Sequence, residues 1–182
     1  MARGSVPLVF QDRPWWLDVL LRGPGVYSSK RARVIITLVI AAGAAATAYS
    51  GWIHLYLWGK QFGYRDIPTI GPLFLLQGIV CILMALVTIV TRRVVVLIVT
   101  GGMLIASFCA LIIAVEVGLF GWQDSWSAQY ALTALYDEIA GAALLLGAAV
   151  ALAWKPRTGR NGSRSQATQG HRAVGGSWVA GS

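Results

Sequence analysis

The fold is decided by residues 72–118, PLFLLQGIVCILMALVTIVTRRVVVLIVTGGMLIASFCALIIAVEVG. Two apolar stretches, 72–90 and 94–118, flank a short basic turn that contains Arg92 and Arg93. Each stretch is long enough for a helix that crosses a hydrocarbon core roughly 30 Å thick, which takes about 20 residues. The sequence therefore predicts a helical hairpin that spans a membrane.

Two further apolar stretches lie on either side of this hairpin, at 34–58 and 129–154. With 57% hydrophobic and 12% charged residues, the chain of 182 residues lies far from soluble domains, in which roughly 25% of residues are charged. We therefore expect an all-α polytopic membrane protein, a four-transmembrane-helix bundle over 34–154. Residues 1–33 form a basic segment, and residues 155–182, rich in Gly, Ser and Arg, are expected to be a disordered tail.

The basic residues are divided unequally between the two sides of this predicted bundle. Six Lys and Arg precede the first stretch, two lie in the turn between the second and third, and five lie in the tail, whereas the two opposite loops hold only Lys60 and Arg65. Since basic loops stay in the cytoplasm, 13 of the 15 Lys and Arg place both termini there. The net charge of +8 then suits a lipid bilayer with anionic headgroups rather than nucleic acid. We expect a multi-pass protein of the plasma membrane.

The N-terminal segment leaves two questions open. Residues 14–22, PWWLDVLLR, are too short to span and favour a helix at the level of the headgroups, although a disordered tail with a hydrophobic patch is an equal alternative. Residues 34–45, followed by ATA at 46–48, also fit the apolar region and cleavage site of a signal peptide. Because the preceding basic region is long and the apolar run continues to Trp58, we favour an uncleaved first span.

Small residues recur at every fourth position of the third stretch. They give one helix face with almost no side-chain bulk, so that a neighbouring backbone can approach closely. The neighbour is either another helix of the same chain or a membrane-protein partner, including a second copy in a homo-oligomer. This small-residue stripe consists of Gly102, Ala106, Ala110, Ala114 and Gly118.

Ionisable side chains inside a membrane are costly, so they are the first candidates for function. The predicted spans contain four, and all of them lie within about two helical turns of the outer boundary. Gln77 enters the second span at a similar depth, and the adjoining loop supplies Lys60, Arg65 and Asp66. The sequence thus predicts a polar pocket that faces outward, and its candidate residues are His54, Gln77, Glu116, Asp137 and Glu138.

Three interpretations of this polar group stay open. In the first, the acids pair with Lys60 and Arg65 and only secure the top of the bundle. In the second, Glu116 and Glu138 exchange protons with His54 in a coupled transport or redox step. In the third, the pocket binds a lipid, a quinone or another amphipathic molecule.

The spacing of chemically reactive residues argues against metal and catalytic sites. His54 has no second His or Glu at ligand spacing within the spans, and neither Cys81 nor Cys109 has a CxxC partner. Ser50 lies one helical turn from His54, but a Ser in a span usually bonds a carbonyl of its own helix. We predict no metal ligands and no catalytic residues, and the sequence indicates no particular cofactor.

The first outer loop, 59–72, is expected to have a fixed shape. Gly63 and Gly71 permit backbone angles that are closed to other residues, while Pro68 and Pro72 fix φ and stiffen the turn. Such a loop either closes the bundle or covers a pocket.

The spans and loops also carry a distinctive set of short motifs, which are HLYLW (54–58), GYRDIPTIG (63–71), LFLLQ (73–77), GLFGW (118–122) and Glu138. This set resembles a family of small four-span integral membrane proteins from actinobacteria. The resemblance covers about residues 34–154. It implies the four-span architecture and no particular activity or site residue.

The sequence favours an accessory or structural component of a membrane assembly, because it combines a small-residue stripe with no complete catalytic constellation. The alternative is a small transporter or a redox- or lipophile-binding protein with an outward pocket. A membrane-embedded enzyme that acts on lipid comes third.

Overall fold

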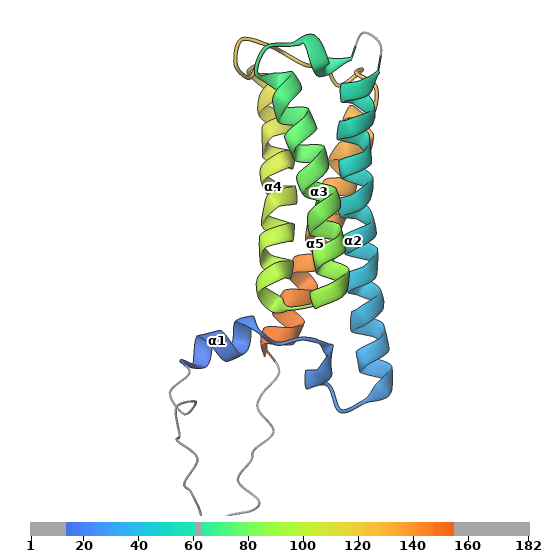
Figure 1. Cartoon of the computed structure of the whole chain (residues 1–182), viewed down its shortest axis with the longest axis vertical. Coiled ribbons are helices and arrows are strands. Elements are labelled where there is room, and N and C mark those ends of the chain that lie inside the picture. The colour runs from blue at the N-terminus through green and yellow to red at the C-terminus, as the bar shows by residue number, and fades with distance from the viewer. Residues whose placement is uncertain (1–13, 61–62, 155–182) are drawn as a thin grey trace, which may run out of the picture.

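A computed structural model of the chain describes residues 14–60 and 63–154, which form a helical bundle (Figure 1). Four helices in this part of the chain are long and apolar enough to cross a membrane, which confirms the predicted fold class. Residues 1–13, which begin the predicted basic segment, and the predicted disordered tail, 155–182, lie outside the described residues. The long helices are α2 (Lys30–Gly59), α3 (Ile70–Thr91), α4 (Val94–Glu116) and α5 (Ala131–Trp154). The short helices are α1 (Trp15–Leu20), η1 (Pro24–Val26) and η2 (Tyr64–Asp66).

The four long helices stand side by side and alternate in direction (Figure 1). Helix α2 packs along both α3 and α5, and α5 packs along α4, whereas α3 and α4 touch each other more sparsely. The connections α2–α3 and α4–α5 lie together at one end, which we call the loop end. The α3–α4 turn and α1 lie at the other, which we call the basic end.

Glycines set the close approach of α2 to its neighbours. A Cβ on Gly51 would lie 2.9 Å from Cys81 Cβ and 3.0 Å from the carbonyl oxygen of Gly78, so α2 and α3 pack almost backbone to backbone. On the other side of α2, a Cβ on Gly43 would lie 2.7 Å from the side chain of Leu145 in α5. These seams use small residues in the way that helices in lipid do.

The hydrophobic core is concentrated toward the basic end. Large aliphatic side chains from α2, α4 and α5 fill the space between these helices, and those with no more than 1% of their surface exposed include Ile40, Val94, Leu97, Leu145 and Leu152. The hydroxyls of Thr88 and Thr100, 3.0 Å apart, join α3 to α4 in the same half. The basic half of the bundle is therefore well filled by large side chains.

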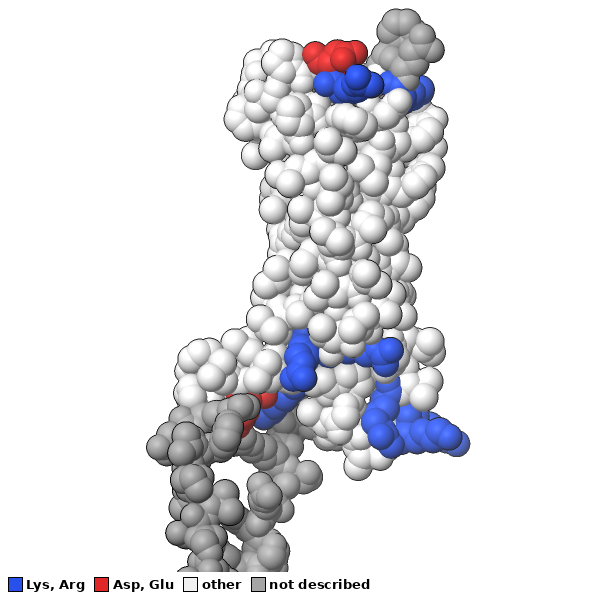
Figure 2. All heavy atoms as spheres, in the orientation of Figure 1, with Lys and Arg blue, Asp and Glu red and all other residues white. Residues whose placement is uncertain are grey.

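The segment before α2 is hydrogen-bonded to the basic end of the bundle. Arg22 Nη1 donates to the carbonyl oxygen of Ala153 at 2.8 Å, and the Tyr27 hydroxyl donates to that of Ala151 at 2.9 Å. The amide of Val94 donates to the carbonyl oxygen of Arg22 at 3.0 Å. Helix α1 thus occupies the segment in which an interfacial helix was predicted, and Trp15 is 73% exposed on it. On the face in Figure 2, blue Lys and Arg atoms surround the basic end, while uncharged atoms cover the middle of the bundle.

The two glycines predicted to shape the loop between α2 and α3 are required by space rather than by unusual backbone angles; the positive φ in this loop, +66°, belongs to Thr69. Gly63 has a φ of −84°, and both glycines with positive φ in the described residues, Gly118 and Gly121, belong to the other loop. A Cβ on Gly63 would lie 2.1 Å from the carbonyl oxygen of Leu57, and one on Gly71 would lie 2.3 Å from that of Arg65. The predicted reason for these two glycines was therefore wrong, because they are needed where the chain passes over itself.

Candidate functional site

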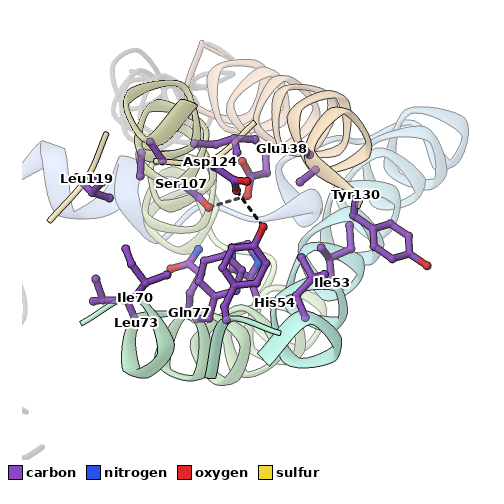
Figure 3. A pocket seen from close by; sticks show the side chains of 18 of the residues that line it. Ile53, His54, Ile70, Leu73, Gln77, Ser107, Leu119, Asp124, Tyr130 and Glu138 are labelled. Atoms are coloured by element: carbon purple, nitrogen blue, oxygen red, sulfur yellow. Dashed lines mark hydrogen bonds between the residues drawn. The ribbon is translucent and has the colours of Figure 1, made fainter. Parts of the chain in front are cut away.

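A cavity of about 310 Å³ lies inside the loop end of the bundle, where α3 and α4 diverge (Figure 3). All four long helices and both loops contribute to its wall. Most of the lining side chains are apolar, including Ile53, Leu57, Ile70, Phe74, Leu111 and Ala134. The polar side chains among them are His54, Tyr64, Gln77, Ser107, Asp124, Gln129, Tyr130 and Glu138.

Glu138 is the most buried ionisable residue of this wall. The residue is 1% exposed, and its Oε1 accepts hydrogen bonds from Ser107 Oγ at 2.6 Å and from Ser50 Oγ at 3.2 Å. Its second oxygen, Oε2, is buried and has no hydrogen-bond partner among the described residues. Because buried polar atoms are nearly always hydrogen-bonded, Oε2 is an unusual feature of the wall.

His54 is held by the helix that carries it. Its Nδ1 lies 2.8 Å from the carbonyl oxygen of Ser50, one turn earlier in α2. A carbonyl oxygen can only accept, so Nδ1 carries a proton, and Nε2 presents a lone pair whenever the ring is neutral. The ring also packs against Phe74 of α3, with 5.0 Å between the ring centroids. Ser50 therefore holds both Glu138 and His54, one through its hydroxyl and the other through its backbone.

Gln77 faces the same cavity from α3. Its Nε2 donates to Cys81 Sγ at 3.4 Å, which orients the amide along its own helix. The carbonyl oxygen of this side chain is then left as a possible acceptor, since Gln77 lines the cavity.

Aromatic rings cover the cavity at the loop end. Tyr64 of η2 stacks on Phe74 with 4.3 Å between centroids and meets the edge of Trp122 at 5.1 Å. Its hydroxyl donates to Asp124 Oδ2 at 3.0 Å, which joins the two loops to each other. Burial raises the pKa of Tyr64 well above its ordinary value, and the neighbouring carboxylate raises it further. The phenol therefore stays protonated and the bond between the loops persists at neutral pH.

Two predicted pocket residues lie elsewhere. Glu116 is exposed at the end of α4, where its Oε1 accepts a hydrogen bond from Trp126 Nε1 at 2.9 Å. Asp137 is adjacent to Glu138 in sequence but points to another side of α5, and it does not line the cavity. Its buried Oδ2 has no partner among the described residues either. The structure thus brings together three of the five predicted pocket residues, His54, Gln77 and Glu138.

The predicted loop residues close the surface above the cavity without lining it. Lys60 Nζ donates to Gln129 Oε1 and so connects the two loops. The Arg65 guanidinium lies 5.6 Å from the ring centroid of Trp58, in a cation–π contact. Asp66 is exposed at the end of η2.

The small-residue stripe of α4 divides into two parts. Ala106, Ala110 and Ala114 line the cavity, where their small side chains leave its volume open. Gly102 is exposed, and a Cβ there would meet nothing within 4 Å. Gly118 follows the end of α4 with a φ of +91°.

The cavity reaches the side of the bundle between α3 and α4. Leu76 of α3 lines it although 58% of its surface is exposed, and Leu73 does so with 40% exposed. Across from them, Ala106 of α4 is also exposed. Apolar, partly exposed lining residues on both helices show that the cavity wall extends to the side of the bundle.

Ser107 completes the site, although the sequence did not single it out. Ser107 lies next to Ala106 on the cavity face of α4, but a lone Ser inside a span carries little signal. Within residues 14–60 and 63–154, no group of three or more His, Cys, Asp and Glu side chains is placed to hold a metal ion. The arrangement is thus suited to holding a small molecule by its apolar body and a few hydrogen bonds. Comparison with known protein families, curated proteins and solved structures finds no match to the chain.

Proposed function

We propose that this protein resides in the plasma membrane with both termini in the cytoplasm and binds one amphipathic molecule in the cavity at its outer end. The observation that carries this proposal is Glu138 Oε2, a buried oxygen without a partner in the wall of an apolar cavity. A ligand whose polar group reaches this oxygen would complete its hydrogen bonding.

The energetic argument starts from the cost of this carboxyl group. A buried polar atom without a hydrogen bond destabilises a protein by about 1–3 kcal/mol, and more if it is charged. Apolar side chains at positions 50, 107 and 138 together would avoid that cost, so the carboxyl group is explained better by an interaction outside the folded chain. Ionisable groups inside membranes serve function in this way by default.

The size and lining of the cavity support the same proposal. Its volume of about 310 Å³ lies at the lower end of the range of about 300–1,000 Å³ found for small-molecule sites. The lining is mostly apolar, with His54, Gln77 and Glu138 on its walls. A lipophilic molecule dissolved in the bilayer would enter from the side between Leu76 and Ala106.

The accessory role predicted from the sequence remains the second candidate. Gly102 supports it, because this exposed glycine of α4 has open space above it and would allow the backbone of a partner helix to approach. The two functions differ in what must co-purify with the protein, a small molecule or another membrane protein.

Purification in a mild detergent, followed by solvent extraction and mass spectrometry, tests the proposal. The variant Ala110→Phe places a ring in the cavity, while the matched control Ile113→Phe adds the same ring to a residue that is 44% exposed on α4. We expect a small molecule to accompany the wild type and Ile113→Phe at equal yield and to be lost from Ala110→Phe. Loss of a co-purifying protein from Gly102→Leu, with no small molecule bound to any form, would instead favour the accessory role.

A further inference from the structure

We infer that the polar group of the ligand is a hydrogen-bond donor with a positive charge, so that the cavity takes an amphipathic amine in its ammonium form. This inference rests on the proposed function and specifies its ligand. It follows from comparing the polar groups near the cavity that are hydrogen-bonded within the protein with those that have no partner there.

The donors closest to Glu138, and the hydroxyl of Tyr64 above it, are occupied within the protein. The hydroxyls of Ser50 and Ser107 donate to Glu138, at 3.2 and 2.6 Å. The Tyr64 hydroxyl donates to Asp124 at 3.0 Å, and Nδ1 of His54 donates to the carbonyl oxygen of Ser50 at 2.8 Å. Beside Glu138, a ligand that could only accept hydrogen bonds would therefore meet little but the second N–H of the Gln77 amide. The indole N–H of Trp122 and the amide of Gln129 belong to the loop between α4 and α5, at the loop end of the cavity.

The groups left over beside Glu138 are acceptors when its carboxyl group is ionised and the ring of His54 is neutral. Glu138 Oε2 then has no partner, His54 presents the lone pair of Nε2, and Gln77 presents its side-chain carbonyl oxygen. A primary ammonium group carries three N–H donors, which matches the number of these acceptors.

Charge points in the same direction. No Lys or Arg in the described part of the chain pairs with Glu138, because Lys60 donates to Gln129 and Arg65 lies over Trp58. An ionised carboxylate is stable away from water only when it is paired, and an ammonium group would provide the counter-charge. The rings that cover the cavity would add cation–π attraction, and these are Tyr64, Phe74 and Trp122.

Three probes with closely similar apolar bodies test this inference: decylamine, decanol and methyl nonyl ketone. Their affinities are measured by calorimetric titration of the protein in nanodiscs, with the heat of titration into empty nanodiscs subtracted. We expect the amine to bind most tightly, the alcohol more weakly and the ketone, which has no donor, most weakly. Glu138→Gln should weaken amine binding at least about tenfold, because a charge-assisted hydrogen bond is lost, while decanol should change less. The control Glu116→Gln should change neither, since Glu116 lies outside the cavity.

The outcomes separate the ligand class from the proposed function. If the ketone binds more tightly than the amine and Ala110→Phe abolishes its binding, the cavity is a ligand site but the inferred class is wrong. The class is equally wrong if Glu138→Gln leaves the affinity for the amine unchanged. If Ala110→Phe retains the affinities of the wild type for all three probes, binding occurs outside the cavity and the proposed function itself fails.

Discussion

The carboxyl group of Glu138 should prove to be a cost to stability rather than a support for the bundle. The sharpest perturbation is the triple variant Ser50→Ala, Ser107→Ala, Glu138→Met, which replaces the acceptor and both donors by apolar groups. Met is close to Glu in length and fills the same space. We expect this variant to be as stable as the wild type or more stable, and to lose ligand binding.

The magnitude follows from the hydrogen bonds at the site. In Glu138→Met alone, two hydroxyls lose their acceptor, and that of Ser50 is fully buried. Each orphaned group costs about 1–3 kcal/mol, less whatever is regained when the hydroxyl turns to the carbonyl four residues earlier. We therefore expect the single variant to lose about 2 kcal/mol. The triple variant should regain that amount, since exchanging every partner for apolar groups of similar shape is nearly neutral or stabilising.

The free energy of unfolding is measured by titrating the protein in mixed micelles with a denaturing detergent and following its helical circular dichroism. Glu116→Met serves as the control, because Glu116 is exposed and bonded to a loop residue. The reasoning would be refuted by a triple variant that is less stable than the wild type by more than about 2 kcal/mol. In that case the carboxyl group secures the bundle, as the first interpretation of the sequence holds.

Three further predictions concern packing, orientation and pH. Gly51→Leu should destabilise the bundle by about 1–3 kcal/mol in the same unfolding assay, because α2 and α3 must separate, whereas Gly102→Leu should lie within about 0.5 kcal/mol of the wild type. In a background without the native cysteines, Ser125→Cys should react with a membrane-impermeant maleimide in intact cells and Arg92→Cys only after lysis; the reverse pattern would overturn the orientation inferred from charge. Burial raises the pKa of Tyr64, so the folded protein holds this proton more tightly than the unfolded chain, and the stability gained is complete below about pH 10 and lost as the pH rises further. Tyr64→Phe should lose about 1 kcal/mol at pH 7 and show a smaller decline above pH 10, and an unchanged pH profile would contradict this.

The four spans could be predicted because hydrocarbon thickness fixes how many apolar residues a helix needs. Helix α4 begins at Val94 as predicted, since the basic turn before it leaves no alternative. Helix α2 instead begins at Lys30, four residues before the predicted first span. A helix can continue beyond the hydrocarbon core into the headgroup region, where its residues are polar and a hydropathy pattern does not detect it.

The packing faces were harder to predict than the spans. Helix α4 packs against α5 through Gly101, where a Cβ would lie 2.8 Å from the side chain of Leu146, while the predicted stripe begins one residue later. Small residues at every fourth position identify a helix face with little side-chain bulk, but they do not identify which helix packs against it. Here the face that Ala106 and Ala110 share borders the cavity.

The site residues could be predicted from the sequence only where placing their side chains in lipid has a large free-energy cost. His54, Gln77 and Glu138 are expensive in lipid wherever they point, and so they stand out in the sequence. Their partners do not stand out, because a hydroxyl such as that of Ser107 is cheap in a span. Asp137 shows the opposite limit, since two neighbouring acids on a helix point about 100° apart and sequence alone does not say which one faces inward.

The hydrogen bonds between the segment before α2 and the end of α5 impose an order on the biogenesis of the protein. Arg22 and Tyr27 bind carbonyl oxygens of Ala153 and Ala151, which are 131 and 124 residues further along the chain. During synthesis, the segment before α2 therefore cannot dock until α5, the last of the four long helices, has been made. A nascent chain that stops short of Ala151 has its hairpin of α3 and α4 but lacks these hydrogen bonds, so docking of the segment before α2 marks a completed four-helix bundle.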